Sequence, residues 1–199
     1  VVENIETVDD LAYLYLDLMD ELDLNDVTLM GFSMGGWIAA EIAVRSTARI
    51  ARLILVDAVG IRVPERDDCE IVDLFSIHPS KMPGLAMHDP SHAPKPAEMS
   101  DEERLMMHRA RESLVRYGWE PYLHNPKLRG RLHRVDVPTL LIWGESDGIV
   151  PVAYGEAFRD SIPGSALQII KEAGHQPQAE QTDKFVATVV EFTTAAQAA

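Results

Sequence analysis

Short apolar runs and amphipathic segments alternate along most of the chain. Four runs have the β-branched and leucine-rich composition of buried parallel strands, at residues 27–30, 52–57, 138–144 and 166–170. Segments with apolar residues at helical spacing stand before, between and after them, at residues 7–22, 37–44, 152–160 and 183–193. This alternation predicts an α/β fold, in which helices flank a mostly parallel sheet.

The first predicted helix has a defined start and a long apolar stripe. Thr7 is the expected N-cap, and Asp10 stands three positions later, as in a capping box. The stripe comprises Val8, Leu11, Tyr15, Leu18, Met19 and Leu22. We expect it to pack into the core and not to bind a ligand, because such stripes usually serve packing.

The pattern changes between residue 60 and residue 135. Prolines at 64, 79, 83, 90, 94 and 96 interrupt this region, which also contains six of the seven histidines. One convincing helix is predicted at residues 100–117, with Ser100 as its N-cap and Glu103 at the third position. We therefore expect a core formed by residues 1–60 and 136–199, and a partly helical cap insertion formed by residues 61–135.

One short sequence, Gly31-Phe32-Ser33-Met34-Gly35-Gly36, joins the first apolar run to the next helix. It is typical of a sharp strand-to-helix turn that presents a serine. Gly31 and Gly35 are expected beside Ser33 because the turn brings strand and helix too close for a Cβ atom. The helix directs its N-terminus at Ser33, so the backbone N–H of Met34 and the helix dipole can stabilise negative charge there.

An acid and a histidine follow two later strands. Asp147 comes after the third apolar run in Gly144-Glu145-Ser146-Asp147-Gly148, and His175 comes after the fourth. Because the carboxyl ends of parallel strands share one edge of a sheet, Ser33, Asp147 and His175 are expected to converge. A serine nucleophile needs a base, and the base needs an orienting acid. Asp57 also ends a strand and is the alternative acid.

These motifs carry a family resemblance, and their order of Ser, then Asp, then His supports it. The chain resembles roughly the carboxyl-terminal two-thirds to three-quarters of an α/β-hydrolase fold protein with a helical cap. The match runs from Val8 to about Phe192 and includes GFSMGG, VPTLLIWGESDGIVP and GHQPQAE. The resemblance implies that Ser33 is the nucleophile, His175 the general base, Asp147 its acidic partner and the Met34 N–H half of the oxyanion hole.

The resemblance also implies that part of the fold lies outside this sequence. Proteins of this kind have more strands than the four found here, and the first strands would lie upstream of Val1, together with the loop that donates the second oxyanion N–H. The strand before Ser33 would then have an open edge. An open edge favours a homo-oligomer or a complementing amino-terminal segment as partner.

The expected activity is hydrolysis of carboxylic esters through an acyl-enzyme intermediate. Hydrolysis of carbon–carbon bonds in ring-cleavage products ranks second, because relatives of that kind often have Asn and Trp where this chain has Phe32 and Gln176. A catalytically impaired, truncated scaffold that binds a ligand or a partner is the third alternative. Phe32, Ile149 and Val150 are the candidate substrate contacts.

Composition limits the partners. The net charge of −14, from 32 acidic and 18 basic residues, argues against nucleic acid or an anionic membrane. The single cysteine, Cys69, fits a reducing compartment, and we expect a cytoplasmic protein. His88 and His92 have the spacing of metal ligands on a helix, but Pro90 between them makes that helix unfavourable, so neither a metal nor another cofactor is expected.

Overall fold

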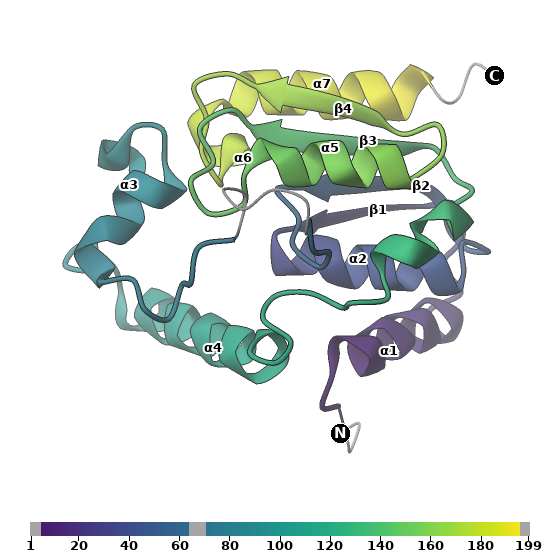
Figure 1. Cartoon of the computed structure of the whole chain (residues 1–199), viewed down its shortest axis with the longest axis horizontal. Coiled ribbons are helices and arrows are strands. Elements are labelled where there is room, and N and C mark those ends of the chain that lie inside the picture. Colours follow the sequence, from purple (N-terminus) through teal and green to yellow (C-terminus); the bar gives the residue numbers. More distant parts are fainter. Residues whose placement is uncertain (1–4, 64–70, 196–199) are drawn as a thin grey trace.

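A computed structural model describes residues 5–63 and 71–195, and Cys69 lies outside them. Four parallel strands form one sheet in the order β1-β2-β3-β4 (Figure 1). The strands are β1 (Val27–Phe32), β2 (Ile50–Val56), β3 (Thr139–Gly144) and β4 (Ala166–Ile170). All four expected strands are present, and the predicted α/β class is confirmed: a parallel sheet flanked by helices.

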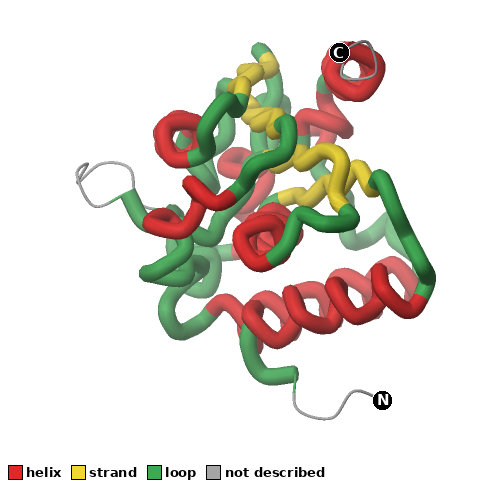
Figure 2. Tube along the Cα trace, turned by 90° about the vertical axis from the view of Figure 1, so that its right-hand side faces the viewer, coloured by secondary structure: helices red, strands yellow, loops and turns green. Residues whose placement is uncertain are grey.

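Alternate residues of each strand supply two separate apolar layers. In β2, Leu53 and Leu55 join the main core, where helices α2 (Met34–Arg45) and α5 (Val152–Ser161) pack. Ile54 and Val56 face the other way, toward Phe185 of helix α7 (Thr182–Ala195). Figure 2 shows α7, which leads to the C-terminus, and the first helix, α1 (Val8–Glu21), on opposite sides of the strands. The two layers explain why the buried stretch 53–56 of β2 is apolar at successive positions.

Helix α1 (Val8–Glu21) begins with the expected capping box, in which Asp10 binds the backbone N–H of Thr7 and the Thr7 hydroxyl binds that of Asp10. Val8 and Met19 of its stripe are buried. The prediction of core packing is wrong for Tyr15, Leu18 and Leu22, which are 44%, 39% and 57% exposed. The reason is that α1 packs chiefly against α2, so residues of the stripe that point away from α2 stay exposed.

Strand β1 has one neighbouring strand, β2, among the described residues. A cavity of about 390 Å³ runs along β1 and is lined by Tyr15, Leu29, Met30, Gly31, Phe32, Gly35, Ile38, Ala39 and Ile42. The edge of β1 beside the serine turn is thus apolar and has no strand paired with it in the part of the chain described.

The segment between β2 and β3 contains no strand within residues 71–135 (Figure 1). Its main helix, α4 (Asp101–Gly118), has the expected capping box between Ser100 and Glu103. The sequence did not predict helix α3 (Met82–Ala86) or the 3-10 turns at Pro79–Lys81, Pro90–His92 and Arg129–Arg134. Each is short, and three of the four contain proline, which hides a helical pattern.

The end of this segment packs with the main core. Leu123, Leu128, Leu132 and Val135 are 0% to 2% exposed there. By their packing, these residues belong to the core, although the cap insertion was expected to extend to residue 135. The boundary of the cap insertion stays a prediction. In residues 5–63 and 71–195, no helix is both long and apolar enough to span a lipid bilayer.

Candidate active site

Ser33 lies at the junction that the sequence predicts. Strand β1 ends at Phe32 and helix α2 begins at Met34, so Ser33 is the single residue between them. Its φ of 49° is one that residues other than glycine rarely adopt. The Ser33 N–H binds the Val56 carbonyl at 2.8 Å, and the Ser33 carbonyl accepts the Trp37 N–H at 3.2 Å. These bonds hold the strained turn in place.

The glycines of this turn do not have the roles that the sequence suggested. A Cβ on Gly31 would lie 2.2 Å from the Gly35 carbonyl oxygen, as expected of a close approach. Gly35 has no atom within 4 Å of such a Cβ, so the steric explanation is wrong there. It applies to Gly36, whose Cβ would lie 2.5 Å from the Cβ of Ala58.

Met34 is the first residue of α2. The first N–H groups of a helix have no acceptor within the helix, and they carry the positive end of its dipole. The N–H groups of Gly36 and Trp37 donate hydrogen bonds to the Ser33 carbonyl. The Met34 N–H is thus placed beside Ser33 as an oxyanion donor would be, and its role in catalysis remains a proposal.

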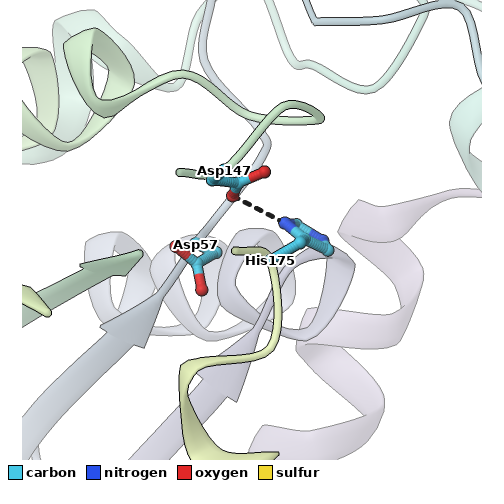
Figure 3. Close-up of side chains that lie close together, drawn as sticks. All are labelled: Asp57, Asp147 and His175. Atoms are coloured by element: carbon cyan, nitrogen blue, oxygen red, sulfur yellow. Dashed lines mark hydrogen bonds and ion pairs between the residues drawn. The ribbon is translucent and has the colours of Figure 1, made fainter. Parts of the chain in front are cut away.

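Asp147 and His175 meet as the sequence predicts. The Nδ1 atom of His175 lies 2.7 Å from Oδ2 of Asp147 (Figure 3). The Asp147 carboxylate has no exposed surface, and its other oxygen accepts the N–H groups of Ile149 and Val150 at 2.8 Å and 2.9 Å. The pairing at Nδ1 leaves Nε2 of the imidazole free to exchange a proton.

Ser33 is not hydrogen-bonded to this pair. Within the described residues, no hydrogen bond joins the Ser33 hydroxyl to His175. Ser33 directly follows β1, and the pair follows β3 and β4, so all three stand at the carboxyl edge of the sheet. Catalytic hydrogen bonds are often long before substrate binds, which makes this arrangement compatible with a nucleophile and its base.

Asp57, the alternative acid, lies beside the pair but does not contact His175 through a hydrogen bond (Figure 3). It is 1% exposed, and its Oδ1 accepts the Gly144 N–H at 2.9 Å. Its Oδ2 is buried without a donor among the described residues. Burial, together with the charge of Asp147, raises the pKa of Asp57 well above its usual value. Burial thus favours the neutral form of Asp57, and Asp147 is the carboxylate hydrogen-bonded to the histidine.

Asp57, Asp147 and His175 are also the set of potential metal ligands found in the described residues, with one ligand atom from each within 4.8 Å of the others. The Asp147–His175 hydrogen bond already occupies one oxygen and one nitrogen of this set. An acid–base pair accounts for the cluster without an ion. His88 contacts Ser146 Oγ at 2.8 Å and His92 lies 3.7 Å from Glu180, so neither faces this cluster.

The three candidate substrate contacts differ in exposure. Ile149 and Val150 are 5% and 0% exposed in the main core, and their contribution to the site is the pair of N–H groups that hold Asp147. Phe32 is 37% exposed and stacks on Phe185 with ring centroids 5.9 Å apart. Ile149 and Val150 thus hold Asp147 in place, and contact of Phe32 with a substrate stays a prediction.

An apolar groove next to Met34 is better placed to hold a substrate. It has a volume of about 610 Å³ and is lined by Leu11, Tyr15, Met34, Gly35, Ile38, Leu74, Phe75, Ile77, Met82, Ala110, Arg111, Ser113, Leu114 and Tyr117. Among these, Arg111 carries the only charge. The sequence did not identify the cap residues of this groove, although Leu114 and Tyr117 follow Ala110 by four and seven positions and so share one face of the helix.

Comparison with known proteins identifies the family. The family model described as "Serine aminopeptidase, S33", a family of α/β hydrolases, matches residues 2–182. The chain belongs to this α/β-hydrolase family. The family number S33 has no connection with Ser33, and the description does not assign a substrate to this chain.

Curated relatives of this α/β hydrolase differ in activity. It is 27% identical, over 88% of its length and 64% of the relative's, to a 2-hydroxy-6-oxononadienedioate/2-hydroxy-6-oxononatrienedioate hydrolase from Cupriavidus pinatubonensis. It is 28% identical, over 84% of its length and 68% of the relative's, to a pimeloyl-[acyl-carrier protein] methyl ester esterase from Nitrosospira multiformis. The chain thus spans about two thirds of the length of these relatives.

A solved structure gives the same fold. A meta-cleavage product hydrolase from Pseudomonas fluorescens IP01 superimposes with a TM-score of 0.73, over 98% of this α/β hydrolase and 75% of that chain. The two sequences are 24% identical, so the likeness supports the fold and not a shared substrate.

Proposed function

We propose that this α/β hydrolase cleaves carboxylic esters through an acyl-enzyme intermediate. The observation that carries the proposal is the buried Asp147–His175 hydrogen bond of 2.7 Å, which stands at the same sheet edge as the strained Ser33 turn. A nucleophile at a helix N-terminus, a histidine with one nitrogen free and a buried orienting carboxylate are the parts that acyl transfer requires.

The proposed reaction has two steps, acylation of Ser33 and hydrolysis of the acyl-enzyme. Ser33 Oγ attacks the ester carbonyl carbon while His175 Nε2 takes the hydroxyl proton, and the Met34 N–H receives the negative charge that forms on the carbonyl oxygen. The tetrahedral intermediate collapses, and His175 returns the proton to the leaving alcohol. Water then attacks the acyl-serine by the same route, which releases the acid and restores Ser33. Asp147 keeps the imidazole oriented and stabilises its charged form throughout.

Cleavage of carbon–carbon bonds is the second candidate. The curated relative from Cupriavidus pinatubonensis bears the name of a hydrolase whose substrates are dicarboxylates. Arg111 lines the groove beside Met34, and a guanidinium is suited to bind a carboxylate at the far end of a bound chain. A catalytically impaired scaffold that binds a ligand or a partner is the third candidate.

A substrate panel separates the candidates. Nitrophenyl esters of graded acyl length are expected to be hydrolysed, with kcat/KM rising as the acyl chain fills the groove and falling once it exceeds it. Arg111→Gln is expected to leave kcat/KM for these neutral esters within a few-fold. The matched control is Arg109→Gln, which changes an exposed cation outside the groove lining.

The same variants test the second candidate. With a 2-hydroxy-6-oxo-dienedioate as substrate, carbon–carbon hydrolysis predicts turnover by the parent protein and a loss of about tenfold to a hundredfold in Arg111→Gln alone, because a charged hydrogen bond is removed. No turnover of any ester by folded protein, together with turnover of the dioate, would reverse the ranking.

Partner and location stay proposals. The acidic chain is proposed to act on a small molecule, without nucleic acid or a membrane as partner, in the cytoplasm. The unpaired apolar edge of β1 is proposed to bind a complementing amino-terminal segment, or a second copy of the chain, because exposed strand edges pair readily.

A further inference from the structure

Glu180 is a buried acid that the proposed reaction does not use. It ends the short helix α6 (Pro177–Glu180), five positions after His175, and its side chain is 1% exposed. A buried charge is costly unless hydrogen bonds compensate it. The contacts of this carboxylate therefore indicate what it does.

One side of the carboxylate binds the loop that carries the histidine. Oε2 of Glu180 accepts the N–H of Gly174 at 2.7 Å, and Gly174 directly precedes His175. The bond fixes the backbone from which the imidazole projects.

The same carboxylate binds the cap segment. Oε2 also accepts the N–H of His88 at 3.1 Å, Oε1 accepts the N–H of Asp89 at 2.9 Å, and His92 Nδ1 lies 3.7 Å from Oε1. Burial raises the pKa of Glu180, but the N–H groups of Gly174, Asp89 and His88 outweigh it and lower the pKa below its usual value. Glu180 is thus held as an anion that bridges two segments about 90 residues apart in sequence.

Further contacts bring the same two parts together. The His175 N–H binds the Ala86 carbonyl at 2.8 Å, and the Gly148 N–H binds the Leu85 carbonyl at 3.0 Å. A Cβ on Gly174 would lie 2.5 Å from the Ala86 oxygen. The end of helix α3 therefore lies directly on the loops that carry His175 and Asp147.

We propose that Glu180 is a positioning residue that fastens the cap segment 85–89 to the loop of His175. Its catalytic consequence rests on the proposed ester hydrolysis, whereas the fastening itself does not. The cap also supplies Leu74, Phe75, Ile77 and Met82 to one wall of the groove. Glu180 thus sets both the orientation of the base and the fit of the acyl chain.

Hydrogen exchange in Glu180→Gln tests the fastening without reference to activity. The amide of Gln retains one acceptor oxygen but presents N–H groups to backbone N–H donors, so the bridge cannot form in full. Amide protons of His88, Asp89 and Gly174 are expected to exchange about tenfold faster or more, while those of strand β3 are unchanged. The control, Glu191→Gln on the exposed face of α7, is expected to change none of them.

Glu180→Asp is the second variant for the exchange experiment, to be used if Glu180→Gln does not fold. Its carboxylate is one methylene shorter, so it can bind the Gly174 side or the His88 and Asp89 side, but not both. Faster exchange on one side only is the expected result. Unchanged exchange at all three amides in either folded variant would overturn the proposal, as would an equal increase throughout the sheet.

Kinetics of Glu180→Gln adds a second readout. A loosened histidine loop is expected to lower kcat for every ester by about tenfold to a hundredfold. A loosened groove wall is expected to raise KM for long acyl esters and leave KM for acetyl esters unchanged. Absence of ester hydrolysis in the parent protein would refute the proposed function, and the exchange result would still decide the role of Glu180.

Discussion

Asp147→Asn is expected to lower kcat for ester hydrolysis by about 10⁴-fold, the loss that the same exchange causes in a serine protease triad. Oδ2 of Asp147 lies 2.7 Å from His175 Nδ1, and its other oxygen is fixed by two backbone N–H groups. An amide in this position keeps the shape but presents N–H groups to the ring, which favours the wrong tautomer. Steady-state kinetics and a melting curve for each variant give the measurement.

Asp57→Asn is the matched control. Since burial and the neighbouring carboxylate raise the pKa of Asp57 and so favour its neutral form, a neutral isostere is expected to leave kcat within a few-fold. If Asp57→Asn inactivates the protein and Asp147→Asn does not, Asp57 is the acid and the assignment is wrong.

The raised pKa of Asp57 also predicts how the free energy of unfolding depends on pH. Its pKa is raised in the folded state, so between the ordinary carboxyl pKa and the raised value the folded chain binds more protons than the unfolded chain. The stability that this proton contributes is present at low pH and is lost as pH rises through that window. Asp57→Asn has no carboxyl group to titrate, so it removes this loss. The difference in melting temperature, variant minus parent, is therefore expected to be more positive at pH 8 than at pH 5.

Gly31→Ala is expected to lower the free energy of unfolding by about 3 kcal/mol or more, at the upper end for overpacking. The added Cβ would meet backbone atoms of Gly35 and Gly36 at 2.2 Å to 2.7 Å, and backbone cannot move without distorting the Ser33 turn. Denaturant unfolding of the variant, compared with the parent, gives the value.

Gly35→Ala is the control within the same motif. No atom lies within 4 Å of its added Cβ, and Gly35 is the second residue of helix α2, where alanine is favoured over glycine by up to about 1 kcal/mol. The variant is expected to be as stable as the parent or slightly more so. Equal losses at Gly31 and Gly35 would contradict the observed packing of the turn.

The sheet and the meeting of Asp147 with His175 could be predicted from the sequence for a simple physical reason. The central strands β2 and β3 are largely buried on both faces and almost continuously apolar, so they stand out in the sequence, and the shorter apolar runs of β1 and β4 complete the pattern. Parallel strands end at one edge, so an acid and a histidine that follow neighbouring strands come together whatever lies between them.

Features that depend on long-range packing could not be predicted in this way. The bridge of Glu180 joins backbone N–H groups about 90 residues away, and backbone donors carry no sequence signal. The difference between Gly35 and Gly36 depends on where Ala58 lies. The exposure of Tyr15 and Leu18 follows from which elements stand beside α1, and periodicity identifies an apolar face without identifying its partner.

Covalent labelling of Ser33 tests the central claim most directly. The folded chain is treated with a fluorophosphonate probe, and the modified residue is located by mass spectrometry of its peptides. The proposed mechanism predicts modification at Ser33, none at Ser146 beside His88, and no label in Ser33→Ala. A protein that melts cooperatively yet takes no label at Ser33 would contradict the assignment of Ser33 as the nucleophile.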